Sequence, residues 1–461
     1  MKQIFKIIWE AVQGEEKNYT TGSINRAIIL LSIPMILEMI MEALFAVVDV
    51  FFVSKVSVNA VATVGLTESV ITLVYSIAIG ISMATTAMIS RRIGEGNSEK
   101  AAEAAVQSMI IAVTFSLILS VAGIFFARDI LSLMGGSDSL IGEGIWYTRL
   151  IFGGNIVIML LFLLNAIFRG AGDAAIAMRA LWIANILNII LDPCFIFGWG
   201  PFPEMGVTGA AVATNLGRGI GVLYQLYMLF KGKVIVKIAR RHVIVVSGVI
   251  RRLLVVSIGG MGQYIIASAS WIFLMRIISE FGEMALAGYT ISIRMLIFAI
   301  LPAWGMANAA ATLVGQNLGA NQPDRAETSV WRSAFLTMAF LLIVSVVYFL
   351  FAEPMVRFFH SDPDVVLYGV ASLKIICLGY VFFAYGMVIS QAFNGAGDTS
   401  TPTWLNFICF WLLQIPLAYV LGVSLKIGPN GVFWAVAISE SILALMCIYV
   451  FRLGKWKLVK I

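Results

Sequence analysis

The sequence predicts an all-α polytopic membrane protein with twelve transmembrane helices in two pseudo-symmetric six-helix lobes. Composition is the first reason: 60% of the residues are hydrophobic and 12% are charged, whereas soluble domains carry about 25% charged residues. The second reason is a series of apolar runs of about 20 residues or more, the length that crosses the hydrocarbon core as a helix. The third is an internal repeat that relates the two halves of the chain.

The apolar runs number twelve, and they are continuous rather than alternating, which excludes a membrane β-barrel. Six of them fall in each half, so both halves have the same orientation and are related by an axis along the membrane normal. The expected spans are residues 24–54, 61–90, 101–127, 141–168, 177–198, 206–231, 247–280, 284–314, 326–351, 365–393, 402–423 and 431–453.

The repeat is carried by short motifs that share a spacing of 225 residues. The motif Phe-Arg-Gly-Ala-Gly-Asp at 168–173 returns as Phe-Asn-Gly-Ala-Gly-Asp at 393–398, and Gly94 returns as Gly319. Later matches have a spacing of 222 residues: Gly206, Gly209 and Ala213 with Gly428, Gly431 and Ala435. Two homologous halves in an apolar chain are typical of a transporter built as two lobes around a central path.

Basic residues crowd every second loop and both ends of the chain, as in residues 231–241. This bias places both termini in the cytoplasm and the protein in the inner or plasma membrane. The net charge of +6 then reflects topology, so we expect no nucleic-acid partner. We divide the chain into a cytoplasmic amphipathic N-terminus, an N-terminal lobe, a cytoplasmic linker, a C-terminal lobe and a cytoplasmic tail: 1–23, 24–231, 232–247, 248–453 and 454–461.

Residues 3–13 are compatible with a short helix on the inner leaflet, with Ile4, Phe5, Ile8 and Val12 as its apolar side, or with an ordered prefix that has no role. The four cysteines fall in or near the spans without metal spacing. No nucleophile–base arrangement accompanies the two histidines, and no P-loop lysine follows the Gly-rich loops. We therefore expect no catalytic residues and no cofactor, and a protein that is not an enzyme.

Three acids share one face of the first span. Glu38, Glu42 and Asp49 stand at i, i+4 and i+11, which places them within about 40° of one another on a helix. Charged groups are costly in hydrocarbon, so this stripe must face the bundle interior or a watery cavity. Pro34 removes a backbone hydrogen bond four residues earlier and offers a hinge.

A second polar cluster lies on the fifth span. Asn185, Asn188 and Asp192 follow at i, i+3 and i+7, and Pro193 frees the carbonyl of Ile189 and offers a second hinge. A carboxylate, two amides and a free carbonyl on one helix wall could hold a proton or a small cation. The alternative is a buried network that only joins helices.

The two halves differ in their chemistry. At the matching positions Glu38, Glu42 and Asp49 become Gln263, Ala267 and Leu274, and Asp192 becomes Ile415. The N-terminal half is therefore predicted to handle the ion, and we expect no acid of the C-terminal half to hold a cation. That half carries basic residues in its spans instead: Arg276, Arg294 and Lys374.

In its ordered set of features the chain resembles the multidrug and toxic compound extrusion (MATE) transporters, in particular their DinF-like branch. The resemblance rests on the two six-helix lobes, the first span from Pro34 to Asp49, the Asn188…Asp192-Pro193 span and the Gly-Ala-Gly-Asp turn of both halves. It implies that Asp49, Asn188 and Asp192 are ion-coupling positions. Glu38 and Glu42 are not part of that branch's pattern and remain candidates for the cavity or for substrate binding, as does Asn185.

The resemblance implies a monomeric antiporter that exports bulky lipophilic, cationic compounds in exchange for protons or for sodium ions bound at Asp49 and Asp192. Its partners are then the organic substrate, the ion and membrane lipid. The main alternative is a flippase for a lipid-linked precursor with the same architecture. A flippase for an anionic headgroup should line its cavity with Arg or Lys; Arg276, Arg294 and Lys374 keep this alternative open. A third alternative, a membrane scaffold that transports nothing, is disfavoured because it gives the acids inside the spans no role.

Overall fold

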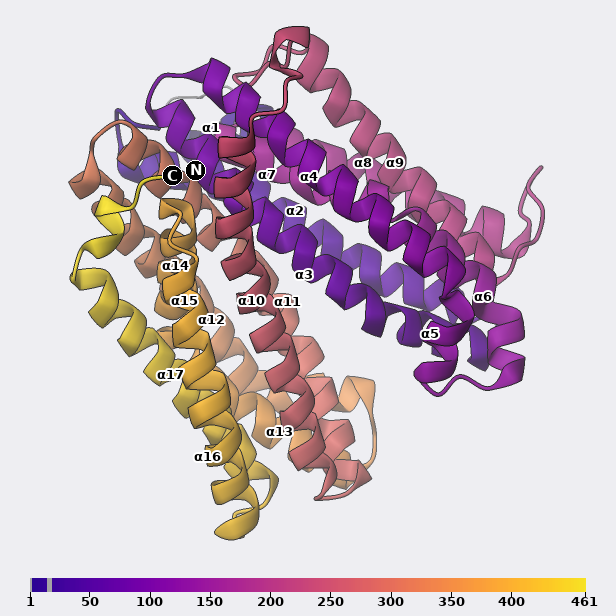
Figure 1. Cartoon of the computed structure of the whole chain (residues 1–461). Helices are drawn as coiled ribbons and strands as arrows, with labels where there is room; N and C mark the ends of the chain where they lie inside the picture. The colour runs from indigo at the N-terminus through magenta and orange to yellow at the C-terminus, as the bar shows by residue number, and fades with distance from the viewer. Residues whose placement is uncertain (1, 15–18) are drawn as a thin grey trace.

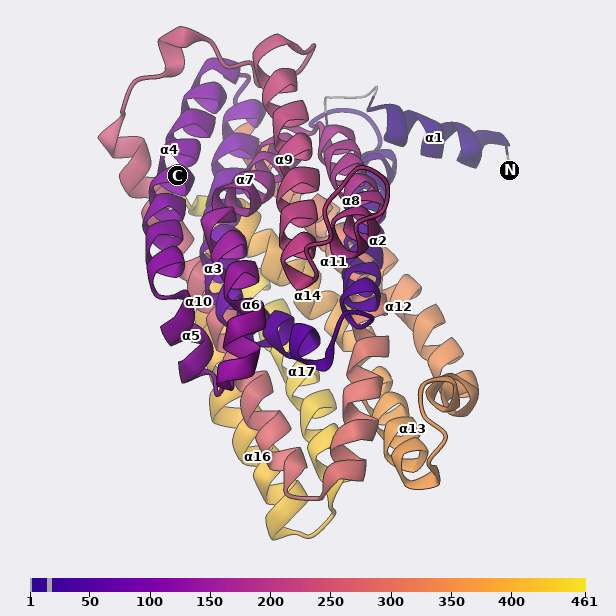
Figure 2. The ribbon, with the colours of Figure 1, turned by 90° about the vertical axis from the view of Figure 1, so that its right-hand side faces the viewer.

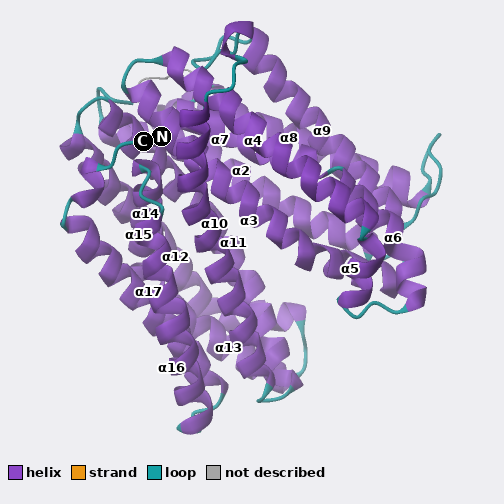
Figure 3. Ribbon diagram, in the orientation of Figure 1, coloured by secondary structure: helices purple, strands orange, loops and turns teal. Residues whose placement is uncertain are grey.

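The computed structural model describes residues 2–14 and 19–461, and all regular secondary structure in these ranges is helical (Figure 3). Eight long helical segments are apolar enough to cross a membrane: α3 (Val58–Gly94), α4 (Ser98–Phe125), α8 (Ala174–Phe197), α10 (Ser247–Ser279), α11 (Glu283–Gly319), α12 (Pro323–Phe359), Ser400–Ser424 and α17 (Pro429–Arg452). Two bent pairs add two spans: α6 (Asp138–Gly153) with α7 (Asn155–Ala171), and α13 (Pro363–Leu378) with α14 (Tyr380–Ala396). Together with α2 (Ile24–Val53) and α9 (Val207–Lys231), which both pack against α8, they make up the predicted twelve.

The remaining elements are short. The eleventh span, Ser400–Ser424, is divided into α15 (Ser400–Asn406), η2 (Phe407–Gln414), α16 (Ile415–Tyr419) and η3 (Val420–Ser424), of which η2 and η3 are π-helical. Outside the spans lie α1 (Lys2–Gln13), α5 (Ala127–Leu133), η1 (Arg240–His242) and η4 (Lys455–Leu458). The helix predicted at 3–13 therefore forms as α1, and its Ile8 is exposed. The side chains of Ile4 and Phe5 are not among those that the structure describes. The placement of α1 on the inner leaflet stays a prediction.

The fourth span of each half is broken, whereas the apolar runs at 141–168 and 365–393 predicted single helices. α6 and α7 meet at 41° across Gly154, and α13 and α14 meet at 58° at Gly379. These two glycines are equivalent under the 225-residue repeat. A Cβ added at Gly154 would overlap the side chain of Asn215, so the absence of a side chain permits the close approach of α9 at the bend.

The helices form two groups that meet at the end carrying both termini and diverge toward the opposite end (Figure 1). The contacts between them are made chiefly by α2 and α3 of the N-terminal lobe with α10 and α11 of the C-terminal lobe. In the view at right angles the N-terminal lobe lies in front of the C-terminal lobe, whose helices extend beyond it at the end opposite the termini (Figure 2). We refer to the end where the lobes meet as the closed end.

At the closed end the two lobes are in contact through equivalent glycines. A Cβ added at Gly94 would overlap the carbonyl oxygen of Gln316, and one added at Gly319 would overlap that of Arg91. Arg91 and Gln316 are themselves 225 residues apart. The contact is therefore made twice, once from each lobe, and the pseudo-two-fold axis runs between Gly94 and Gly319. Only a residue without a side chain permits this backbone approach.

Both terminal segments also bridge the lobes at the closed end. Arg92 of α3 donates a hydrogen bond to the oxygen of Ile461 at 2.6 Å, and Arg91 donates one to the carbonyl of Val459 at 3.0 Å. On the other side, Arg325 of α12 donates to the carbonyl of Thr21 at 2.9 Å. Lys457 of the tail lies 2.5 Å from Glu327, whose carboxylate raises the pKa of this amine.

Candidate functional site

α2 directs its acids into the N-terminal lobe, as the stripe predicted. Glu38 is 1% exposed and accepts hydrogen bonds from Asn165 Nδ2 at 3.0 Å and from Arg169 Nη1 at 3.2 Å, both on α7. Gln225 of α9 donates in turn to Asn165 Oδ1 at 2.6 Å. Glu38 is therefore half of a buried ion pair with neutral hydrogen-bonding neighbours, which is costly to break from one side only.

Glu42, one turn further along α2, makes a second ion pair with a different helix. Arg218 Nη2 of α9 lies 2.9 Å from Glu42 Oε1, and Asn185 Nδ2 of α8 donates to Glu42 Oε2 at 3.3 Å. The guanidinium of Arg218 also lies 4.8 Å from the centre of the Phe45 ring. Arg218 is buried, whereas the side chain of Glu42 keeps 29% of its surface exposed. Glu42 is thus the member of this ion pair that a solute can reach.

The third acid of the stripe belongs to a separate cluster with α8 and α9. Asn188 Nδ2 donates to Asp192 Oδ1 and to Thr214 Oγ1, each at 3.2 Å. Asp49 and Asp192 are buried and lie within electrostatic range of each other. The structure therefore brings together the three residues predicted to couple the ion, whereas Asn185, predicted on the same face of α8, bonds to the Glu42 pair instead.

Three oxygens of this cluster have no hydrogen-bond partner within the part of the chain that the structure describes. They are Asp49 Oδ1, Asn188 Oδ1 and Asp192 Oδ2, and all three atoms are shielded from solvent. An unpaired buried polar group costs about 1–3 kcal/mol, and two carboxylates within electrostatic range of each other add mutual repulsion. A proton or a small cation among these oxygens would remove both costs.

Two arginines of the site were not predicted as site residues. Arg218 lies well inside the expected span 206–231, and a charge at that depth was a signal that we overlooked. Arg169 lies one residue beyond the expected span 141–168, so the sequence places it in a loop. In the structure α7 continues to Ala171, so Arg169 lies in the last turn of the helix, where it reaches Glu38.

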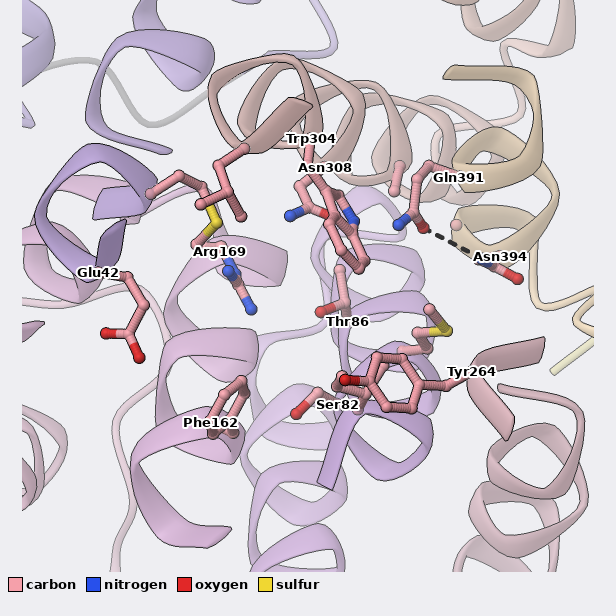
Figure 4. A pocket seen from close by; sticks show the side chains of 16 residues that line it. Glu42, Ser82, Thr86, Phe162, Arg169, Tyr264, Trp304, Asn308, Gln391 and Asn394 are labelled. Atoms are coloured by element: carbon pink, nitrogen blue, oxygen red, sulfur yellow. Dashed lines mark hydrogen bonds between the residues drawn. The ribbon is translucent and has the colours of Figure 1, made fainter. Parts of the chain in front are cut away.

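A cavity of about 230 Å³ lies between the lobes (Figure 4). The N-terminal lobe contributes Glu42 of α2 and Arg169 of α7 to its wall. The C-terminal lobe contributes Trp304 and Asn308 of α11 and Gln391 of α14, so aromatic and amide groups face the two charged groups. The cavity thus offers one acid, one base and several hydrogen-bonding groups to an amphipathic solute.

The C-terminal lobe contains a neutral copy of the Glu38 pair. Gln263 Nε2 donates to Asn394 Oδ1 at 2.9 Å, and Asn394 Nδ2 donates to Gln263 Oε1 at 3.2 Å. These residues occupy the positions of Glu38 and Arg169 under the 225-residue repeat. The same inter-helix contact is therefore made once with charges and once without.

The expectation that the C-terminal half has no acid able to hold a cation overlooked Glu440. Glu440 is equivalent to Arg218 at the 222-residue spacing. Ala267 is equivalent to Glu42 at the 225-residue spacing. Glu440 faces the lobe interior, since residues one turn away on α17 such as Val436 and Ala444 are buried. Among the described residues no ion pair to Glu440 is formed, so this acid in the interior of the second lobe has no basic partner.

The basic residues that kept the flippase alternative open do not line the cavity that the structure describes. Arg276 and Arg294 are exposed, and Lys374 packs with its nitrogen 5.1 Å from the centre of the Phe349 ring. Arg169 is the basic residue that the cavity presents.

The chain is similar to known transporters along nearly all its length. A family model described as MatE matches residues 34–194 and 261–420, once in each half. A probable multidrug resistance protein NorM from Thermotoga maritima is 30% identical over 458 residues, 96% of each chain. An FAD transporter from Shewanella oneidensis is 26% identical and covers 93% of this chain and 94% of its own. The crystal structure of MATE in the straight conformation matches with a TM-score of 0.90 and 27% identity, over 98% of this chain and 99% of that one.

Proposed function

This chain belongs to the MATE family of multidrug efflux transporters, and on that premise we propose that it exchanges bulky lipophilic cations for protons or sodium ions. Membership of the family makes it a membrane transporter of small organic compounds and not an enzyme. Our proposal goes beyond family membership in three respects: the exchange with an ion, the identity of that ion and the positive charge of the exported compound.

The observation that carries the proposal is the set of unpartnered oxygens on Asp49, Asn188 and Asp192. Carboxylate and amide oxygens are ligands for sodium, and a carboxylate is also a proton acceptor. Burial disfavours an unpaired charge, so occupancy by a cation changes the energy of this lobe. An ion can shift a conformational equilibrium only if it binds one conformation better than the other, and such a cluster, assembled from three helices, offers that difference.

The shape of the molecule supports alternating access of the two lobes. The lobes are in contact at the end with the termini and diverge at the opposite end (Figure 1). With the termini in the cytoplasm, this is an outward-facing state. A cation enters at Asp49 and Asp192, α2 bends near Pro34, and substrate leaves to the outside. The lobes then rock to an inward-facing state in which the cation departs, with Pro193 as a second point of bending.

A flippase or exporter of an anionic compound is the second candidate. Arg169 in the cavity wall favours it, and so does the similarity to an FAD transporter, whose cargo carries phosphates. Both charged groups of the cavity wall are held in ion pairs, Arg169 with Glu38 at 3.2 Å and Glu42 with Arg218 at 2.9 Å, but the side chain of Glu42 is the more exposed, 29% against 13% for Arg169. The available charge in the cavity therefore favours a cation.

Transport by the purified chain in proteoliposomes tests the proposal. A gradient of protons or of sodium ions should drive movement of a fluorescent lipophilic cation, and an ionophore that collapses the gradient should stop it. The same vesicles are then loaded with a labelled anionic lipid-linked precursor. Translocation of that lipid without any ion-driven movement of the cation would replace the proposal with the flippase alternative.

The two acids of the first span that pair with arginines should differ in role. Glu42→Gln is expected to weaken binding of organic cations about tenfold or more, since a charge-assisted hydrogen bond contributes about 1.5–3 kcal/mol, and to leave neutral compounds nearly unaffected. Glu38→Gln is expected to lower the melting temperature, by a destabilisation of up to about 3–5 kcal/mol for a buried ion pair that loses one partner, and to leave the preference for cations over neutral compounds unchanged. Binding of cationic and neutral compounds is measured together with thermal unfolding.

The C-terminal lobe provides the control for the Glu38 variant. The double substitution Glu38→Gln/Arg169→Asn copies the Gln263–Asn394 pair and should recover most of the lost stability. If Glu42→Gln weakens neutral and cationic compounds alike while the melting temperature falls, Glu42 is structural and the cavity has no preference for cations.

A further inference from the structure

A groove of about 520 Å³ runs along the outside of the molecule between α2 and α12. α2 contributes Asn25 and Ile29, and α12 contributes Thr328, Trp331, Arg332, Phe335 and Leu336. α2 belongs to the N-terminal lobe and α12 to the C-terminal lobe, so the groove has one wall from each. It lies near the closed end, because both helices begin there, at Ile24 and Pro323.

The polarity of the groove changes along its length. Its polar residues Asn25 and Arg332 are followed by apolar residues, Ile29 on α2 and Phe335 and Leu336 on α12. With a rise of about 1.5 Å per residue, the apolar part of each wall begins about 4.5–6 Å deeper than the polar part. Polar groups at the membrane surface followed by apolar groups at depth match a phospholipid, which has its headgroup at the surface and its acyl chains in the hydrocarbon.

The charge at the polar end is positive. Arg332 is exposed, and its Nη1 donates to Asn25 Oδ1 at 3.0 Å, which leaves other guanidinium N–H groups free to bind phosphate oxygens. Among the described residues Arg332 forms no ion pair with a carboxylate, and Glu327, five residues earlier on α12, is occupied by Lys457 and Trp331. The groove therefore presents one uncompensated cation to the leaflet.

We propose that the α2–α12 groove binds an anionic phospholipid of the leaflet at the closed end. The phosphate lies against Arg332 and Asn25, and an acyl chain lies along Ile29, Phe335 and Leu336. Because its two walls come from different lobes, the groove keeps this shape only while the lobes are together. A bound lipid consequently favours the closed end, since a ligand stabilises the conformation that it binds better.

Lipid binding to the full chain in detergent, followed by native mass spectrometry, tests this site. Phosphatidylglycerol should bind more tightly than phosphatidylcholine, and Arg332→Gln should lower its affinity about tenfold and leave that of phosphatidylcholine unchanged. Arg357→Gln is the matched control, because Arg357 is an exposed arginine near the other end of the same helix, held by Glu353 at 2.9 Å. Ile29→Trp fills the apolar part of the groove and should also weaken phosphatidylglycerol, although the charge is intact.

Three results would overturn the proposal. Equal losses in Arg332→Gln and Arg357→Gln would show only a general attraction of basic residues for anionic lipid. Equal binding of the two lipids to the unsubstituted chain would show a groove that accepts any lipid. Competition by soluble glycerol phosphate as strong as that by the lipid would show a headgroup site without a chain site. Thermal unfolding of each variant separates a loss of binding from a loss of fold.

Discussion

Asp49→Asn and Asp192→Asn should each reduce ion-driven export to background while the protein stays folded in the membrane. An amide keeps the shape of the carboxyl group but can neither gain and lose a proton nor offer a negative charge to sodium. Both side chains are buried and lie within electrostatic range of each other, so the cluster loses half of its charge in either variant. Export of a fluorescent cation from proteoliposomes measures the effect, and gel filtration with thermal unfolding verifies the fold.

Ion binding itself gives a second measurement on the same variants. A cation that binds the folded protein raises its melting temperature according to concentration and affinity, so sodium or acidification should stabilise the unsubstituted chain and not the two variants. Asp138→Asn, which changes a fully exposed aspartate at the start of α6, is the control. If either site variant exports at the unsubstituted rate, ion coupling does not depend on this cluster.

Gly94→Leu should force the closed end apart. The backbone of α11 occupies the place of a Cβ at Gly94, so the side chain can be accommodated only if α3 and α11 separate. Overpacking of this kind costs about 1–3 kcal/mol, enough to change the ratio of two conformations by about 5–150-fold. The distance between spin labels at positions 100 and 324, one on each lobe at this end, should increase, and Gly319→Leu should have the same effect from the other side.

Gly65→Leu is the matched substitution for this experiment. Gly65 lies on the same helix as Gly94, but no atom lies within 4 Å of the position of its Cβ. It should leave the distance between the labels unchanged. An unchanged distance in Gly94→Leu as well, with the protein folded, would mean that the helices yield locally and that the glycine contact does not hold the lobes together.

The sequence predicted the spans well because membrane helices are long, continuous and apolar. Predicted and observed ends of the first span differ by one residue, 24–54 against Ile24–Val53. It also predicted that the acids of this span face inward, since hydrocarbon allows no other orientation. The bends at Gly154 and Gly379 could not be read from it, because an apolar run has the same composition whether it is straight or broken.

Which residues pair with which inside the site could not be predicted from the sequence, for a different reason. Glu38, Glu42 and Asp49 share one face of α2, yet each meets a different neighbour: α7 for Glu38, α9 for Glu42, and the α8 cluster for Asp49. Helical periodicity gives the face of a residue but not the helix that the face meets. For the same reason the sequence did not predict that Asn185 bonds to Glu42 while Asp192, on the same helix α8, bonds to Asn188.

The neutral contact between Gln263 and Asn394 has a consequence for how this protein came to have one charged half. Where two halves descend from one ancestral unit, each position exists twice, and one copy can change while the other preserves the original role. The Gln263–Asn394 pair shows that two amides suffice to join these helices. Assembly of the lobe therefore does not require the charges of Glu38 and Arg169 at the equivalent place. Their presence in the N-terminal lobe then reflects a role other than assembly. The chain thus carries its own comparison sequence: one half shows this contact made with amides alone, and the other shows it made with charges.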